Sequence, residues 1–223
     1  NRAEARFGRI FAQTYGQAES PMVITCLRPE DHDRVGSCGR PFTIVEVAVF
    51  DENDKPLKAG ERGEIVCRGP QTMAYYWNNP EATANAFRNG WLHTGDVGYM
   101  DEDGFFYLVD RKNDMLISGG YNVYPREVED VLLAFEGVVE AAVVGLPDEK
   151  WGERIHAVVA GRGLDPEAIL AHARGKLASY KRPKGVEIWP ELPKTSANKI
   201  LRRAVRDRIV AREAAAGGTE KVS

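Results

Sequence analysis

The first side chains that could do chemistry lie in the pentapeptide YGQAE at residues 15–19. Its aromatic ring, Tyr15, could stack on a nucleotide base, and its carboxylate, Glu19, could hold a cation. The pentapeptide follows a strand-like run at residues 9–14, so we expect it to form a tight polar turn. A turn without a ligand is the alternative interpretation, because glycine and polar residues favour turns in any case.

A second candidate is the aspartate that ends the heptapeptide GWLHTGD at residues 90–96. We expect Asp96 to lie in a glycine-flanked turn between two strands. A carboxylate there can accept hydrogen bonds from the neighbouring hydroxyls of a ribose. An aspartate that only stabilises its own turn is the alternative.

A third stretch, residues 104–129, changes character along its length. An apolar strand pattern gives way at residues 110–114 to a charged run without a pattern, and a glycine pair, Gly119 and Gly120, follows. Pro125 then opens a helix, since proline suits the first helical position. A short polar joint between ordered segments is typical of a hinge, and adjacent glycines let the backbone approach a ligand closely. An ordinary surface turn is the alternative.

The last candidate is the polar loop PKTSANKI at residues 193–200, which holds Lys194 and Lys199. The loop has no apolar periodicity, so packing does not explain its lysines. A helix follows, whose apolar face includes Leu201 and Val205. A lysine on such a loop presents a positive charge that can stabilise anionic oxygens during a reaction.

The elements that would position these groups differ on the two sides of the polar joint. Before it, short β-rich runs between turns predict a small sheet or barrel and not a parallel doubly wound core. After it, we expect an amphipathic helix at residues 125–135 and a second helix that Asp165 caps and Pro166 opens. The strands expected in this second part lie at residues 138–145, 154–160 and 186–189.

This pattern predicts an α+β fold in two bodies. A short-stranded, β-rich subdomain comes first, and a small α+β domain with a three-stranded sheet and helices follows, joined to it by a hinge. The predicted bounds are residues 1–112 for the subdomain, 113–213 for the small domain and 214–223 for a disordered tail.

The composition excludes several classes of protein. A chain of 223 residues with 43% hydrophobic content can bury real cores. It contains no apolar run long enough to span a membrane, and its first six residues lack the apolar core of a signal peptide. Residues 1–110 carry 11 basic and 17 acidic side chains, whereas residues 111–223 carry 19 and 16. The mildly basic second half suits a small polyanion but falls far short of nucleic-acid binding. The odd number of cysteines lacks zinc spacing, which favours reduced thiols and a cytoplasmic location.

Taken together, YGQAE, GWLHTGD, DRKNDMLISGGYNVYPREVE and PKTSANK resemble, in this order and spacing, the adenylate-forming superfamily. This group includes acyl-CoA synthetases, luciferases and the adenylation domains of peptide synthetases. These motifs are most similar to those of CoA synthetases of fatty or aryl acids. The resemblance implies a reaction in two steps: a carboxylate attacks the α-phosphate of ATP to give acyl-AMP and pyrophosphate, and the small domain then swings about the hinge so that the thiol of CoA displaces AMP.

The resemblance also implies roles for the nucleotide-binding side chains. Tyr15 would stack against adenine, and Asp96 would accept hydrogen bonds from the ribose hydroxyls. Arg111 would contact the same nucleotide, and Glu19 would help to hold Mg²⁺.

Further roles carried over from the family belong to the hinge and the small domain. Asn113 would be the pivot, and Lys199 would bridge the substrate carboxylate and the α-phosphate as the catalytic lysine. Gly119 and Gly120 would line the narrow path of the CoA pantetheine arm, and Trp151 would flank it.

The chain departs from the family pattern at three of these positions. Ala18 stands where Thr or Ser is usual, Asn113 where Asp or Lys is common, and Asn198 where Gly precedes the catalytic lysine. The phosphate-binding loop of the family is not in the chain, and the chain does not begin with Met. We therefore expect the C-terminal portion of a longer enzyme, missing its N-terminal part and inactive by itself.

The sequence leaves two alternatives open. The enzyme could hand its acyl group to a carrier protein or to oxygen; Trp151 and the basic second half favour CoA, with Lys181 and Arg182 as candidates for its phosphates. Alternatively, the chain could be a non-catalytic nucleotide-binding module, although the complete set of charged residues argues against this. The expected partners are thus a small fatty or aryl acid, ATP and CoA.

Overall fold

The computed structural model describes residues 2–196 and 198–217. The chain divides into two compact units, Asn1–Asn113 and Asp114–Ser223. The boundary lies one residue after the one expected, within a short 3₁₀ turn, η2 (Lys112–Asp114).

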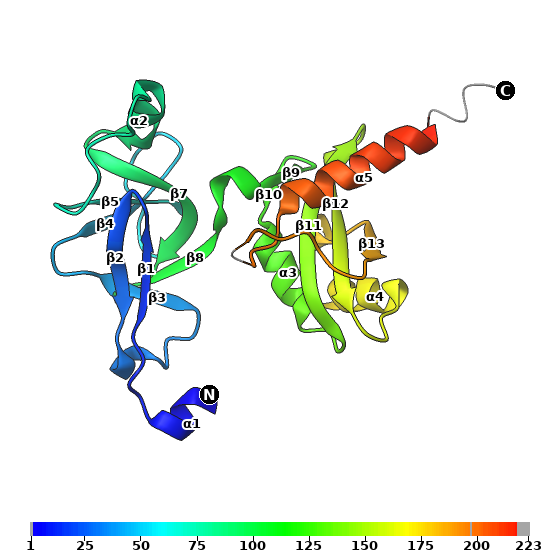
Figure 1. Ribbon diagram of the computed structural model, residues 1–223, viewed down its shortest axis with the longest axis horizontal. Helices are drawn as coiled ribbons and strands as arrows, with labels where there is room; N and C mark the ends of the chain where they lie inside the picture. Colours follow the sequence, from blue (N-terminus) through cyan, green and yellow to red (C-terminus); the bar gives the residue numbers. More distant parts are fainter. Residues whose placement is uncertain (1, 197, 218–223) are drawn as a thin grey trace. The chain divides into compact units, whose positions relative to one another are not determined.

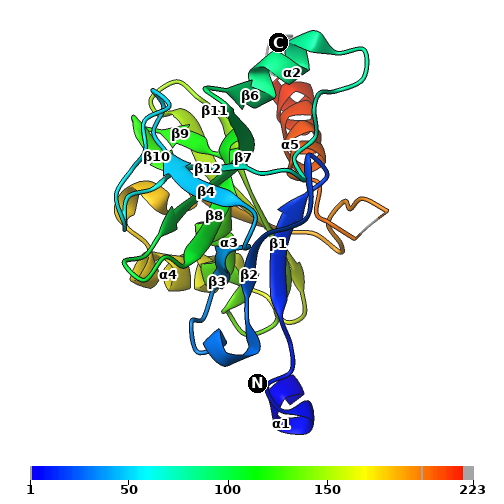
Figure 2. The ribbon, with the colours of Figure 1, turned by 90° about the vertical axis from the view of Figure 1, so that its left-hand side faces the viewer.

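Unit 1 is built on an antiparallel sheet in the order β1-β2-β3-β8-β7-β5-β4, with β6 paired to β7 (Figure 1). Its strands are β1 (Gln13–Gln17), β2 (Ser20–Leu27), β3 (Ser37–Pro41), β4 (Glu46–Phe50), β5 (Gly63–Arg68), β6 (Phe87–Arg88), β7 (Trp91–Met100) and β8 (Phe106–Arg111). Helices α1 (Arg2–Phe7) and α2 (Pro80–Ala86) lie at opposite ends of this unit (Figure 1, Figure 2).

The core of unit 1 comes from the β-branched and aromatic residues that alternate along these strands, because successive strand side chains point to opposite faces. Ile24, Ile65, Leu92 and Phe106 are almost completely buried. Tyr15 belongs to the same cluster, which fixes its ring on the inner side of β1.

Unit 2 contains a five-stranded sheet in the order β10-β9-β12-β11, with β13 paired in parallel to β12. Its elements are β9 (Leu116–Ser118), β10 (Tyr121–Val123), α3 (Pro125–Leu133), β11 (Val138–Asp148), β12 (Gly152–Gly161), α4 (Pro166–Lys176), a 3₁₀ turn η3 (Ser179–Lys181), β13 (Gly185–Ile188) and α5 (Arg202–Gly217).

Helices cover both faces of the β11–β12 hairpin (Figure 1). Val143 and Ile155 pack on one face with α3 and α4, whereas Ala142 and Val158 pack on the other face with α5. The α+β class predicted from the sequence is therefore confirmed. The sheet has two strands more than the three expected, since β9 and β10 form an additional hairpin.

The structure corrects three local expectations. Tyr15 lies inside β1, and the turn is confined to Ala18 and Glu19. Asp96 lies inside β7 and not in a turn between strands. Helix α5 extends to Gly217, so residues 214–217 of the expected disordered tail are helical, and the rest of that tail, 218–223, lies outside the described residues. No helix among the described residues is long and apolar enough to cross a membrane.

Candidate functional site

Asp96 projects from a bulge in strand β7. Residues 94–96 face the single residue Ile65 of β5, and Gly95 within the bulge has a φ of +74°. The Thr94 hydroxyl donates to the Ile65 carbonyl (2.6 Å) and accepts from the backbone amide of Asp96 (3.1 Å). A bulge redirects a side chain away from the regular alternation of a strand, so this one sets the direction of the Asp96 carboxylate.

Tyr15 on β1 holds the Asp96 carboxylate with a hydrogen bond. Its hydroxyl donates to Asp96 Oδ2 at 2.6 Å, and the residue is only 9% exposed. Burial and the neighbouring carboxylate raise the pKa of Tyr15, so the phenol keeps its proton and remains a donor. This contact joins two of the residues expected to bind nucleotide. It also gives Tyr15 an additional role, as a support for Asp96, that the sequence did not indicate.

Arg111 lies directly opposite Asp96 on the adjacent strand β8. Its Nε is 3.6 Å from Asp96 Oδ1, and its side chain is 71% exposed, so the ion pair is loose and the guanidinium can turn to another anion. Burial raises the pKa of Asp96, and the hydrogen bond from Tyr15 and the charge of Arg111 offset this only in part. Tyr15, Asp96 and Arg111 thus form one cluster, here called the Asp96 cluster.

A buried carboxylate, Glu64 on β5, supports the bulge from the protein interior. It accepts hydrogen bonds from the backbone amide of Gly95 (3.1 Å) and from Lys112 Nζ (2.9 Å), and it lies 3.0 Å from His93 Nδ1. Burial acts to raise the pKa of Glu64, but the bonds from His93 and Lys112 outweigh it and hold the pKa below its usual value. Glu64 therefore connects the Asp96 bulge to the residue that precedes the expected pivot, Asn113.

Glu19, the expected metal ligand, is half-buried in the turn between β1 and β2. Its Oε1 accepts a hydrogen bond from the Tyr76 hydroxyl (2.7 Å), which raises the pKa of Tyr76 to about 12. Within the described part of the chain, no group of three or more His, Cys, Asp or Glu side chains could enclose a metal ion. A metal bound here would thus need oxygens from a ligand in addition to Glu19.

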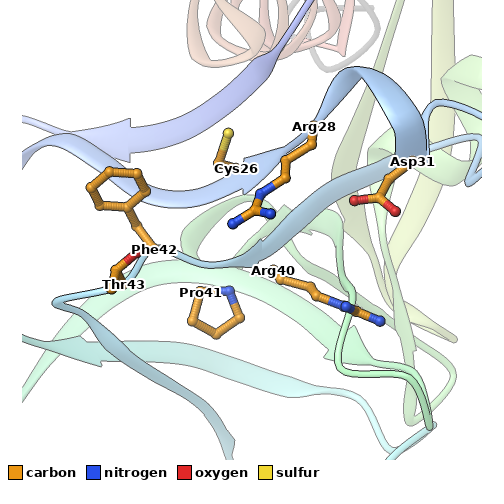
Figure 3. Close-up of a pocket in the computed structure, with 7 residues that line it drawn as sticks. All are labelled: Cys26, Arg28, Asp31, Arg40, Pro41, Phe42 and Thr43. Carbon is orange, nitrogen blue, oxygen red and sulfur yellow. The ribbon is translucent and has the colours of Figure 1, made fainter.

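A separate hollow on unit 1 lies between β2, the η1 turn (Pro29–Asp31) and β3 (Figure 3). It is lined by Cys26, Arg28, Asp31, Arg40, Pro41, Phe42 and Thr43. None of the site residues expected from the sequence lines it.

In unit 2, Gly119 and Gly120 form the two-residue turn between β9 and β10. Their φ angles are +59° and +81°, as a tight hairpin turn requires. The Gly119 amide donates to the Trp151 carbonyl (2.9 Å), and a Cβ on Gly119 would lie 2.7 Å from the indole ring. A Cβ on Gly120 would meet open space. The structure therefore brings Gly119 and Trp151 together, with Gly120 beside them.

Two lysines flank the Trp151 ring. Lys150 Nζ and Lys184 Nζ lie 5.1 Å and 5.0 Å from its centre, within the range of a cation–π contact. The two cations proposed from the sequence are engaged elsewhere: Lys181 pairs with Glu127 (2.6 Å), and Arg182 donates to the Leu177 carbonyl (2.9 Å).

Lys199 lies on a narrow loop between β13 and α5. The Thr195 amide donates to the Lys199 carbonyl (2.8 Å), and the Lys199 amide donates to the Thr195 hydroxyl (3.2 Å). Asn198 adopts a φ of +61°, which explains why it can replace the usual glycine, since asparagine tolerates the left-handed region. The Lys199 side chain is exposed. Lys194, the other lysine of the loop, is paired with Glu140.

Two family models match the chain. The model described as "AMP-binding enzyme" matches residues 1–77, and the model described as "AMP-binding enzyme C-terminal domain" matches residues 127–199. The chain belongs to the AMP-binding enzyme family. This agrees with the adenylate-forming resemblance of its motifs.

The chain is similar to CoA ligases of different acids. It is 49% identical over 215 residues to the medium/long-chain-fatty-acid–CoA ligase FadD8 of Mycobacterium tuberculosis, covering 91% of the chain and 38% of the relative. It is 45% identical to a feruloyl-CoA synthase of an Amycolatopsis species, covering 90% and 42%. The chain thus spans about 40% of the length of these relatives.

A solved structure with the same fold carries a nucleotide. This is the O-succinylbenzoate coenzyme A synthetase MenE of Bacillus subtilis in complex with AMP, with a TM-score of 0.83 and 36% identity. The match covers 91% of the present chain and 42% of MenE.

Proposed function

We propose that this chain forms the C-terminal part of an ATP-dependent carboxylate–CoA ligase. The complete enzyme would convert an acid, ATP and CoA into acyl-CoA, AMP and pyrophosphate through an acyl-AMP intermediate. The observation that carries this proposal is the Asp96 cluster: a carboxylate redirected by a bulge, held by Tyr15 and paired across the sheet with Arg111, in a chain of the AMP-binding family.

On unit 1, the Asp96 cluster would bind AMP and ATP. An ionised Asp96 would be able to accept hydrogen bonds from the two neighbouring hydroxyls of a ribose. The exposed Arg111 guanidinium would contact the same nucleotide. The stacking of adenine on Tyr15 stays a prediction, since the ring is largely covered.

The donor set at Glu19 fits Mg²⁺ accompanying a nucleotide. Mg²⁺ keeps several waters and is commonly held by one or two carboxylates together with substrate phosphates, and Glu19 is a half-buried carboxylate held in place by Tyr76. Bound there, the ion would neutralise charge on the phosphates.

On unit 2, Lys199 would act in the first half-reaction. An exposed ammonium on a hydrogen-bonded loop can reach the substrate carboxylate and the α-phosphate, where it stabilises negative charge in the transition state. The paired Lys194 is less suited to this role, because Glu140 already compensates its charge.

The second half-reaction would use the Gly119–Gly120 turn. A pantetheine arm is thin, and the absence of a side chain at Gly120 leaves open space for it beside Trp151. The acid class is proposed as fatty or aryl, in line with the names of the similar ligases. A cytoplasmic location stays a prediction.

The proposal is tested with the full-length enzyme that contains this chain. Acid-dependent exchange of pyrophosphate into ATP should be seen with a fatty or aryl acid, and AMP release should accelerate on addition of CoA. Acceleration by a carrier protein and not by CoA would favour the alternative acceptor. Absence of exchange with every acid offered would contradict the proposal, and the 223-residue chain alone should show no exchange.

A further inference from the structure

Arg202, the first residue of helix α5, joins two carboxylates of unit 2 in one ion-pair network. Its Nε and one Nη donate to both carboxylate oxygens of Glu129 on α3, at 2.8 Å and 2.6 Å. The other Nη donates to Asp114 Oδ2 at 2.6 Å. Glu129 is buried and also accepts from the backbone amide of Val143 on β11 (3.0 Å).

This network lies at the C-terminal end of the loop that carries Lys199; each end of the loop is called a foot below. Arg202 follows Lys199 by three residues, and the Leu201 amide between them donates to the Pro193 carbonyl (2.8 Å), which closes the loop. At the other foot, Lys194 and the Leu192 amide are bound to Glu140 on β11. Both feet of the loop are therefore fixed to carboxylates of the domain core.

The network also reaches the expected pivot. Asp114 follows Asn113 directly and is the first residue of unit 2. Its contact with Arg202 makes the start of unit 2, α3 and the foot of the Lys199 loop parts of one hydrogen-bonded assembly. We therefore expect the proposed rotation about Asn113 to move the loop together with the start of unit 2.

We propose that Arg202 is a positioning residue for the adenylation step, which holds the Lys199 loop in register with the pivot. This rests on the proposed role of Lys199 in acyl-AMP formation. Arg202 does not touch the reacting atoms. Its contribution is geometric, and an error of about 1 Å in the position of a reacting group can cost about a hundredfold in rate.

Arginine is needed here because its planar fork binds a carboxylate with two parallel bonds, whereas lysine offers a single point charge. Arg202→Lys therefore keeps the charge that buried Glu129 requires and removes the fixed geometry. Asp114→Asn, at a partly exposed side chain, weakens only the link to the pivot. Arg206→Lys is the matched control: Arg206 lies one turn further along α5 and donates only to the Gly145 carbonyl among the contacts described.

In the full-length enzyme, Arg202→Lys should lower kcat for acyl-AMP formation by about 10- to 100-fold, with KM for acid and ATP nearly unchanged. Thioester formation from supplied acyl-AMP should be retained. Asp114→Asn should act in the same direction but less strongly, and Arg206→Lys should affect neither step. In the 223-residue chain, Arg202→Lys should accelerate amide hydrogen exchange at Thr195, Asn198 and Lys199.

Normal acyl-AMP formation by Arg202→Lys, or an equal loss in both half-reactions, would overturn the proposal. So would unchanged amide exchange in the loop, which is measured without any activity. If the wild-type full-length enzyme forms no acyl-AMP, the proposed function itself is wrong, and the exchange measurement still decides whether Arg202 orders the loop.

Discussion

Lys199 is the side chain whose removal should separate the two half-reactions most clearly. Lys199→Ala in the full-length enzyme should lower acyl-AMP formation by about 10²- to 10³-fold, the usual cost of losing one preorganised electrostatic contact in a transition state. Thioester formation from supplied acyl-AMP should be nearly unchanged, because we expect the Gly119–Gly120 turn to act in that step. Pyrophosphate release and acyl-AMP consumption measure the two steps.

Lys194→Ala is the comparison for this variant. Lys194 pairs with Glu140 and anchors one end of the loop, but we do not place it at the reacting atoms. Lys194→Ala should therefore impair the first step less than Lys199→Ala does. A wild-type rate in Lys199→Ala together with a large loss in Lys194→Ala would reverse the assignment.

We expect Asp96 to lower the folding stability of the chain at neutral pH and to strengthen nucleotide binding. Its folded-state pKa is raised, so the folded chain binds the proton more tightly than the unfolded chain, and stability falls as pH rises from the unfolded pKa through the folded pKa. Asp96→Asn should therefore raise the urea midpoint at neutral pH, with the gain disappearing in acid. In the full-length enzyme it should weaken AMP binding by about 10- to 100-fold, the cost of losing hydrogen bonds to a charged group.

An exposed acid of the same unit, Asp103, provides the control. Asp103→Asn should leave both AMP affinity and the pH dependence of stability nearly unchanged, since its ion pair with Arg34 lies at the surface. A lower urea midpoint for Asp96→Asn at neutral pH would contradict the expectation that Asp96 lowers folding stability.

At single residues, the sequence predicted the groups expected to meet a ligand but not the groups behind them. Tyr15, Asp96 and Arg111 were recognised from their motifs, and the structure brings them together. Glu64 and Arg202 were missed as partners because their contacts join residues far apart in the chain. A single carboxylate in a strand or one arginine among many on a helix gives no local signal of such a contact.

Among the elements, the β9–β10 turn offers a matched pair of substitutions. Gly119→Ala places a methyl group against the Trp151 ring, whereas Gly120→Ala places it in open space, and both positions have positive φ. Both variants share the backbone strain of a left-handed alanine, about 1–2 kcal/mol. Gly119→Ala should additionally displace Trp151, so its fluorescence spectrum should shift and thioester formation should fall more than acyl-AMP formation. An unchanged spectrum would mean that the turn absorbs the methyl group.

Strand β13 and helix α5 share an ion pair that should make unit 2 sensitive to acid. Arg212 binds Glu187 with two hydrogen bonds, and these bonds lower the pKa of Glu187 to about 2 from 4.5. Burial lowers the pKa of His156, which is another partner of Glu187. Both groups bind protons more weakly in the folded chain, so the stability they provide is lost as pH falls, for Glu187 between about 4.5 and 2.

Glu187→Gln should therefore reduce the acid dependence of the urea midpoint of the 223-residue chain. Glu213→Gln, which removes the more exposed pair with Arg154, should change it little. Identical acid profiles for the wild type and Glu187→Gln would show that this pair does not control acid unfolding.

Elements with a strong pattern were predicted and elements with a weak one were not. Proline at the first position and apolar residues at helical spacing indicated α3, and the Asp165 side chain caps α4 by accepting from the Ala168 amide (3.0 Å). Strands β9 and β10 have only three residues each, too few for alternation to appear. Asp96 was assigned to a turn because Gly95 suggests one, whereas long-range pairing with β8 keeps it in a strand.

For the whole molecule, the decisive variant is Asn113→Pro in the full-length enzyme. Proline fixes φ near −65°, whereas a pivot must pass between two backbone states. We expect acyl-AMP formation to be retained and the overall rate to fall. Asn113→Ala, which keeps the backbone free, should support both steps. Equal loss of both half-reactions in Asn113→Pro would place the pivot elsewhere or show that Asn113 is needed for folding.

The residues on either side of Asn113 are each bound to their own unit. Lys112 is bonded to buried Glu64 in unit 1, and Asp114 to Arg202 in unit 2. A tether between two bodies normally samples many conformations, and this search lowers the effective concentration of one body at the other. Because both neighbours are anchored, we expect the proposed rotation about Asn113 to have few degrees of freedom. High salt screens the half-exposed Lys112–Glu64 pair. We therefore expect high salt to loosen the joint and to lower the effective concentration of Lys199 at the α-phosphate.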